Sequence, residues 1–146
     1  MTSLLTLVSS QPTRTLAPGD ILVAQGEGGG DLYVLERGRL AVERDGVVIA
    51  TITQPGTAVG EMSVLAGTRN SATVRAEEET KVRAIRDAAK VLLAHPELAL
   101  RLGALVAGRL DATSALLVEM SNQANGNAER GLIGRLMAAL HGPRKD

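Results

Sequence analysis

Residues 59–74 read VGEMSVLAGTRNSATV, and this stretch decides the fold and the expected site. It begins with Gly60 and Glu61, passes through a short apolar segment and a polar hinge, and ends in residues typical of a strand. A glycine lets the backbone approach a ligand closely, and a helical turn presents converging N–H groups to a phosphate. We therefore expect these residues to hold the phosphate and the ribose of a small nucleotide.

The side chains of this stretch suit a sugar phosphate better than a bare anion. Glu61 would begin a helical turn over residues 61–65 that Gly67 ends. Its carboxylate repels phosphate but accepts hydrogen bonds from sugar hydroxyls. The candidate ligand-binding residues of the stretch are Gly60, Glu61, Met62, Ser63, Arg69, Asn70, Ser71 and Ala72. An ordinary β-loop-β connection without a ligand is the alternative that these residues alone leave open.

Short segments with the pattern of β-strands surround this stretch. We expect strands at residues 13–16, 21–25, 32–36, 39–44, 47–53, 72–76 and 81–85, with 32–36 half-buried. Asp45-Gly46 is a strong signal for a two-residue hairpin. The glycine-rich run at 26–31 has no long helix after it, which excludes a Rossmann loop and indicates a hairpin loop. Together these features predict a mainly β fold with C-terminal helices, an antiparallel jelly-roll (β-roll) of about eight strands.

Helical patterns lie at both ends of the roll. Leu4, Leu5 and Leu7 predict one short N-terminal helix that packs on the domain. Asp87 is placed as the N-cap of a helix over residues 88–94, and Pro96 as the first residue of a long helix that runs to about residue 122. Apolar residues recur in it at spacings of three and four, as in a heptad pattern: Leu98, Leu102, Leu105, Val106, Leu110, Leu117 and Met120, with Thr113 in the same stripe.

The long helix is the expected dimerisation element. Its first part would cover the roll, and the rest would leave an apolar face that a second copy buries. We therefore expect a parallel homodimer through residues 97–121. A helix packed wholly on its own domain is the alternative.

Residues 59–74 resemble the phosphate-binding cassette of the cyclic-nucleotide-binding domains of the Crp/Fnr (catabolite activator) family, and we call them the cassette below. Further likeness to that family lies in residues 16–20, 25–27, 31–33 and 38–40. The resemblance implies that Glu61 holds the ribose 2′-hydroxyl. It also implies that Ser71 and Ala72 contact the cyclic phosphate, with Gly60 as the family glycine before the glutamate.

One residue departs from the family pattern at a position that matters. The phosphate-binding arginine of the family falls on Asn70, and the nearest arginine, Arg69, comes one residue early. In an extended strand a shift of one residue turns the side chain to the opposite face. Either a bulge brings Arg69 inward, or the charge-assisted contact to phosphate is missing.

Thr113 and Ser114 extend the resemblance to the long helix. They match a Thr-Ser pair on the dimer helix of Crp/Fnr proteins that touches the adenine of cyclic AMP. The resemblance therefore implies cyclic AMP as the ligand, with cyclic GMP as the other candidate. From the residues alone, such a pair is equally compatible with a polar helix face.

The C-terminal part of the sequence indicates how the domain is organised. We expect one domain over residues 1–122, with the β-roll at 13–85 and helices at 86–122, followed by a linker and a short helix over 123–146. A helix-turn-helix would need two more helices, so direct DNA binding is not expected. Any output would pass to an unknown protein partner.

The composition excludes several classes of function. There is no cysteine, which excludes disulfides, thiol catalysis and thiolate metal sites. His95 and His141 are the only histidines and neither lies among the expected strands, which argues against a cupin-like metalloenzyme. One tyrosine without Phe or Trp argues against base stacking on single-stranded nucleic acid, and a net charge of +0 gives no general attraction to nucleic acid.

The N-terminus has no basic segment, and its apolar run is too short to span a membrane. We expect a cytoplasmic protein that is not an enzyme, contacts no membrane and has no cofactor besides its nucleotide ligand. The sequence favours a stand-alone cyclic-nucleotide sensor that signals by repositioning the C-terminal helix. The alternative is a degenerate copy of the fold that binds no nucleotide and acts as a dimeric protein-interaction module.

Overall fold

The computed structural model describes residues 3–123 and 127–141. The chain divides into two compact units, Met1–Leu102 and Gly103–Asp146, which are described separately. The predicted boundary between residues 122 and 123 stays a prediction.

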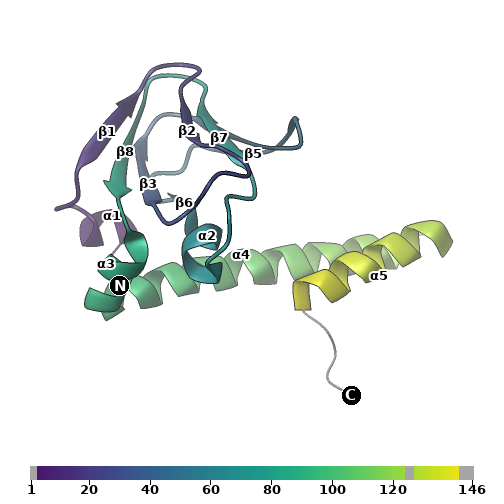
Figure 1. The fold of residues 1–146 in the computed structure, drawn as a ribbon. Helices are drawn as coiled ribbons and strands as arrows, with labels where there is room; N and C mark the ends of the chain where they lie inside the picture. Colours follow the sequence, from purple (N-terminus) through teal and green to yellow (C-terminus); the bar gives the residue numbers. More distant parts are fainter. Residues whose placement is uncertain (1–2, 124–126, 142–146) are drawn as a thin grey trace. The chain divides into compact units, whose positions relative to one another are not determined.

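The first unit is the predicted β-roll with short helices (Figure 1). Its strands are β1 (Thr13–Leu16), β2 (Ile21–Val23), β3 (Leu32–Arg37), β4 (Leu40–Arg44), β5 (Val47–Ile52), β6 (Ala58–Val59), β7 (Thr73–Ala76) and β8 (Thr80–Ile85). Its helices are α1 (Leu4–Leu7), α2 (Glu61–Ala66), α3 (Ala88–Ala94) and the first residues of α4 (Pro96–Gln123). The predicted strands are confirmed within one or two residues, and β6 is a two-residue strand that the sequence pattern missed.

The strands form two four-stranded antiparallel sheets, with the orders β1-β8-β3-β6 and β2-β7-β4-β5. This arrangement confirms the predicted jelly-roll. The hairpin between β4 and β5 turns on Asp45 (φ 53°) and Gly46 (φ 79°), as the Asp-Gly pair predicts. The prediction of a hairpin loop at residues 26–31 is wrong, because β2 and β3 belong to different sheets and the loop crosses from one to the other.

Aliphatic side chains from both sheets build the core, and Tyr33 is its one aromatic member. The largest fully buried apolar residues are Leu16, Leu32, Leu35, Leu40, Ile85, Leu102, Val8, Val34 and Val82. β3 is buried on both faces rather than half-buried as predicted, since all of Leu32, Tyr33, Val34 and Leu35 are inside. One reason is that α1, the predicted N-terminal helix, packs against β3.

A charged cluster fastens the N-terminal segment to the sheet. The Arg83 guanidinium pairs with the Glu36 carboxylate and donates to the carbonyls of Ser9 (3.0 Å) and Gln11 (2.9 Å). Lys81 Nζ lies 3.3 Å from the same carboxylate. The hydrogen bond from Arg83 holds the pKa of Glu36 below its ordinary value of 4.5, with Lys81 adding to the effect.

The start of α3 differs from the prediction. Asp87 adopts a left-handed conformation (φ 48°), and its side chain does not cap the helix. Instead the Asp87 N–H donates to Asp31 Oδ1 at 3.0 Å, and the Ala88 N–H donates to the Gly30 carbonyl at 2.8 Å. The glycine-rich loop, far away in sequence, therefore supplies the acceptors that a local cap was expected to provide.

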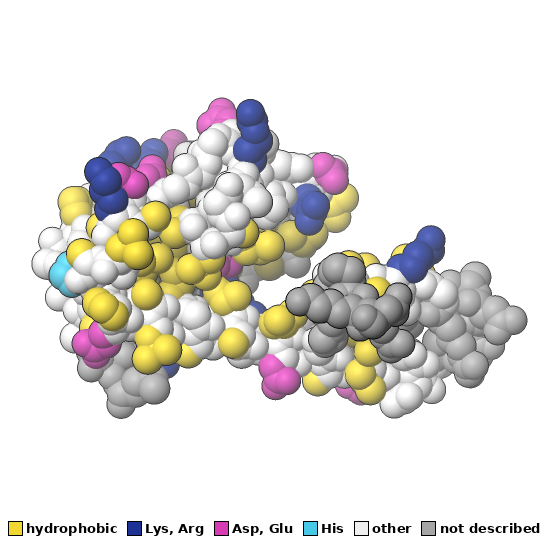
Figure 2. Space-filling view, turned by 60° about the horizontal axis from the view of Figure 1, so that its bottom comes forward, with side chains coloured by type: hydrophobic (Ala, Val, Ile, Leu, Met, Phe, Trp, Pro, Cys, Tyr) yellow, Lys and Arg dark blue, Asp and Glu magenta, His cyan; other side chains and the backbone are white. Residues whose placement is uncertain are grey.

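The hydrophobic surface of the first unit lies partly on its helices. Figure 2 brings forward the side of the roll that carries α2 and α3, and hydrophobic side chains gather there. Met62, Leu65, Leu93 and Leu100 are exposed on α2, α3 and the first turns of α4.

The second unit contains the rest of α4 and α5 (Asn127–His141). Pro96 begins α4, as predicted, and the helix continues through Gln123; residues 124–126 of the predicted linker lie outside the described residues. Leu98 and Leu102 are buried in the first unit, whereas large apolar side chains further along are exposed: Leu110, Leu116, Val118, Met120, Leu132 and Leu136. In the described part of the chain, no single helix is long and apolar enough to cross a membrane. Only α3 and α4 taken together reach the length and composition of a membrane span, and the chain is bent between them.

Candidate functional site

The cassette begins at a glycine that no other residue replaces easily. Gly60 precedes α2 with φ 86°, and a Cβ at this position would lie 2.5 Å from the Asp31 carbonyl oxygen. A side chain is therefore excluded both by backbone conformation and by contact. The helix ends at Gly67 in the left-handed conformation, as predicted.

The glycine-rich loop packs directly on α2. Ser63 is buried, and its hydroxyl donates to the Gly60 carbonyl at 3.0 Å. A Cβ at Gly29 would collide with the Ser63 side chain, so the loop can approach only because residue 29 is glycine. The hydroxyl of Ser63, a predicted ligand contact, is thus engaged within the cassette itself.

The other end of the cassette is held to the same loop through main-chain groups. The Gly26 N–H donates to the Asn70 carbonyl at 2.8 Å, and the Asn70 N–H donates to the Glu27 carbonyl at 3.0 Å. Arg69 is exposed, and its Nη1 donates to the Gly26 carbonyl at 3.1 Å. The Arg69 guanidinium therefore helps to hold the loop, and the Asn70 N–H is already hydrogen-bonded to the Glu27 carbonyl.

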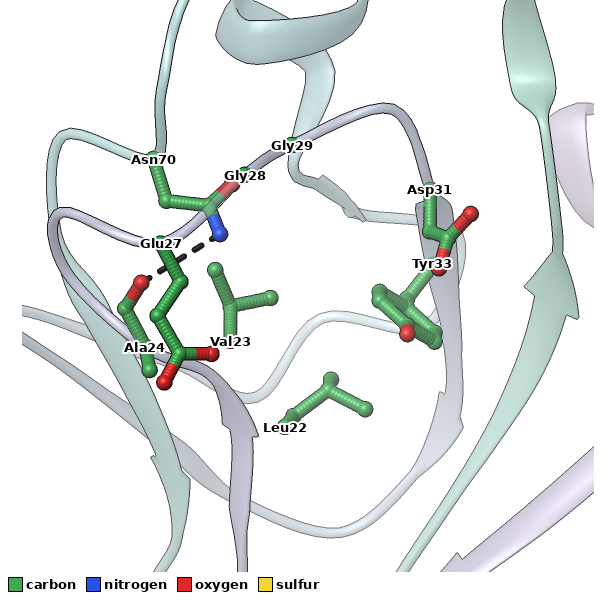
Figure 3. A pocket seen from close by; sticks show the side chains of 9 residues that line it. All are labelled: Leu22, Val23, Ala24, Glu27, Gly28, Gly29, Asp31, Tyr33 and Asn70. Atoms are coloured by element: carbon green, nitrogen blue, oxygen red, sulfur yellow. Dashed lines mark hydrogen bonds between the residues drawn. The ribbon is translucent and has the colours of Figure 1, made fainter.

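A cavity of about 190 Å³ lies between the loop and the roll interior. Its lining is Leu22, Val23, Ala24, Glu27, Gly28, Gly29, Asp31, Tyr33 and Asn70. Glu27 and Asn70 lie on one side, Tyr33 and Asp31 on the other, with Leu22 and Val23 between them (Figure 3). The Asn70 amide nitrogen donates to the Ala24 carbonyl at 3.3 Å.

The exposed surface of the lining is mainly polar, and the bordering side chains of Leu22, Val23 and Tyr33 are members of the buried core. Two carboxylates, of Glu27 and Asp31, belong to the lining, and none of the described lining residues is Lys, Arg or His. Such a surface accepts hydrogen bonds from hydroxyl or amine donors and repels anions. Ligand pockets are commonly about 300–1,000 Å³. The cavity as it stands thus has room for part of a nucleotide.

Of the predicted cassette residues, Asn70 alone is part of the described lining of this cavity. Glu61 is the half-buried first residue of α2, Met62 is exposed, and Ser71 and Ala72 lie between Asn70 and β7. The ligand-binding roles of these residues stay predictions.

The predicted adenine contacts belong to the second unit. The Thr113 hydroxyl donates to the Arg109 carbonyl one turn earlier in α4, at 2.9 Å, and Ser114 is half-buried. Their contact with a base stays a prediction.

The sequence pattern missed Glu27, Gly29 and Asp31 as parts of the site. The glycine-rich run was visible, but its contacts with α2 and Asn70 join residues far apart in sequence. Among the described residues, no group of three His, Asp or Glu side chains is placed to hold a metal ion.

The comparisons with known proteins agree with this architecture. The profile of the family described as "Cyclic nucleotide-binding domain" matches residues 13–91, more than half of the chain. The N-terminal domain of a transcriptional regulator from Streptomyces coelicolor A3(2) is 34% identical, with a TM-score of 0.57; the match covers 74% of this chain and 81% of that domain.

Two further relatives extend the comparison. A cyclic nucleotide-binding domain from Methylobacillus flagellatus KT shares the fold at 22% identity, with a TM-score of 0.66 over 84% of this chain and 72% of that one. A cyclic nucleotide-gated channel of Caenorhabditis elegans is 36% identical over 67 residues, which are 44% of this chain and 9% of the channel. The β-roll, the cassette and these matches together place the chain in the family of cyclic nucleotide-binding domains.

Proposed function

We propose that this chain is a regulatory sensor domain that binds a nucleoside-containing ligand of the cyclic-nucleotide class, and that cyclic AMP is the cyclic nucleotide it prefers. The family match over the roll and the cassette is the observation that carries the proposal. Its relatives include part of a transcriptional regulator and part of a channel, in which such a domain is one component of a larger protein. A binding role, rather than catalysis, follows from this family.

The proposed signal is a change in the position of the C-terminal helix. Glu61 would hold the ribose, the Ser71-Ala72 segment would lie at the phosphate, and Thr113 and Ser114 would approach the base. A ligand shifts the helix only by its difference in affinity for the two helix positions. The change would reach a protein partner through a homodimer formed by α4, and the exposed Leu110, Leu116 and Met120 support this part of the proposal.

A second candidate function is a protein-interaction module that has kept the fold without the ligand. Asn70 at the position of the family arginine favours it, as does the engagement of Arg69 with the Gly26 carbonyl. The two candidates differ in one measurable property, the binding of nucleotide.

Isothermal titration with cyclic AMP and then cyclic GMP separates them. We expect micromolar binding of the wild type. Glu61→Ala should weaken it by at least about tenfold, because the ribose hydroxyls would lose their hydrogen-bond acceptor. Glu78→Gln, at an exposed turn between β7 and β8, is the matched control and should leave binding unchanged. No heat from wild type with any ribose-containing ligand at millimolar concentration would favour the interaction module.

A further inference from the structure

We infer that the cavity beside the glycine-rich loop binds the uncharged part of a nucleoside and contributes no attraction to a phosphate, so that adenosine binds at least as tightly as cyclic AMP. The inference rests on the proposed function, because it assumes that the domain binds a ligand containing a nucleoside. It adds the chemical class that this part of the site accepts.

The charge of the lining favours a nucleoside over a phosphate. Glu27 brings an exposed carboxylate to the lining, the Asp31 carboxylate already accepts the Asp87 N–H, and the described lining residues include no Lys, Arg or His. A cyclic phosphate carries one negative charge, which the Glu27 carboxylate repels. Arg69 is outside the described lining, and its guanidinium is hydrogen-bonded to the Gly26 carbonyl.

The hydrogen-bonding groups of the lining also favour a nucleoside over a phosphate. A phosphate needs converging N–H donors. At this point of the cassette the Gly26 and Asn70 N–H groups are both used in the main-chain pairing between loop and cassette. One amide hydrogen of Asn70 is engaged by the Ala24 carbonyl. What the lining offers in excess is acceptors, and ribose hydroxyls are the donors that match them.

The test is a titration of the wild-type chain with adenosine, cyclic AMP, guanosine and cyclic GMP at low and high salt. We expect each nucleoside to bind at least as tightly as its cyclic nucleotide. Added salt should narrow the difference by strengthening cyclic nucleotide binding, because it screens the repulsion. Cyclic AMP binding tenfold tighter than adenosine would overturn this inference and leave the proposed function standing. Silence with all four ligands would overturn both.

Substitutions in the lining test whether its charge sets the relative affinity for adenosine and cyclic AMP. Glu27→Gln removes one charge and keeps the main-chain bonds of residue 27, so cyclic AMP binding should tighten by about fivefold while adenosine binding does not. Asn70→Arg should also tighten cyclic AMP binding, because it introduces a cation at the position of the family arginine. Glu78→Gln removes a carboxylate far from the cavity in sequence and should change neither ligand. An unchanged ratio of the two affinities in Glu27→Gln would show the charge argument to be wrong.

Discussion

Two carboxylates of the β-roll, Glu36 and Glu27, stand in opposite surroundings. Glu36 on β3 pairs with Arg83 and Lys81, and Arg83 also holds the N-terminal segment through the carbonyls of Ser9 and Gln11. Glu27 lines a cavity whose described residues include no cation. Main-chain hydrogen bonds, rather than the Glu27 side chain, join its loop to the cassette. A paired charge stabilises the fold, whereas a charge at a cavity is available to select a ligand.

The largest expected effect comes from the loop side. Gly29→Ala places a methyl group against Ser63, and we expect this overpacking to lower the free energy of unfolding by about 1–3 kcal/mol and to weaken ligand binding. Gly28→Ala is the matched control, since a Cβ there meets nothing within 4 Å. Urea unfolding of both variants measures the difference. Equal stabilities would mean that the loop does not rest on α2.

Removing the cation from the Glu36 cluster is expected to have the next largest effect. Arg83→Met loses the pairing with Glu36 and the bonds to the Ser9 and Gln11 carbonyls, and should cost about 1–2 kcal/mol, with partial exposure taken into account. Arg37→Met breaks an exposed ion pair with Glu79 and should be near neutral. Chemical unfolding with ligand absent reports both, and a neutral Arg83→Met would remove the structural half of the comparison.

Acid should weaken the same cluster. The pKa of Glu36 is lowered in the folded protein, chiefly by the Arg83 hydrogen bond, so its ionised form stabilises the fold above the ordinary value of 4.5. This contribution is lost as the pH falls through the lowered pKa of the folded state. Melting temperatures of wild type and Glu36→Gln between pH 7 and pH 3 should therefore converge at the acid end. Parallel curves would contradict this role for Glu36.

The smallest effect is expected at Arg69. Its guanidinium is exposed and donates to the Gly26 carbonyl, so Arg69→Ala should cost about 0.5 kcal/mol or less and change nucleotide affinity less than about twofold. Titration with cyclic AMP measures this. A tenfold loss of affinity would place Arg69 at the phosphate, as expected if a bulge turns its side chain inward.

Local chemistry was enough to predict most of the fold. Turn residues such as Asp45-Gly46 and the helix start at Pro96 have local causes, and both are confirmed. The failures have long-range causes. Asp87 does not cap α3, because acceptors of Gly30 and Asp31 reach its start from the glycine-rich loop.

The candidate site was predicted only in part for the same reason. The cassette was recognised from its own residues, and the conformations of Gly60 and Gly67 agree with it. The place of Glu27 in the cavity depends on a loop that crosses between sheets and pairs with Asn70, which no periodicity encodes. The sequence alone shows Asn70 at the position of the family arginine, whereas its hydrogen bond to the Ala24 carbonyl beside the cavity is known only from the structure.

Ligand is proposed to bind between the glycine-rich loop and the cassette. An NMR titration of the ¹⁵N-labelled chain with adenosine and with cyclic AMP tests it most directly. We expect the amide shifts of residues 26–31 and 59–72 to change together, while those of the turn at residues 77–79 stay fixed. Saturating ligand that leaves residues 26–31 and 59–72 unperturbed would contradict it.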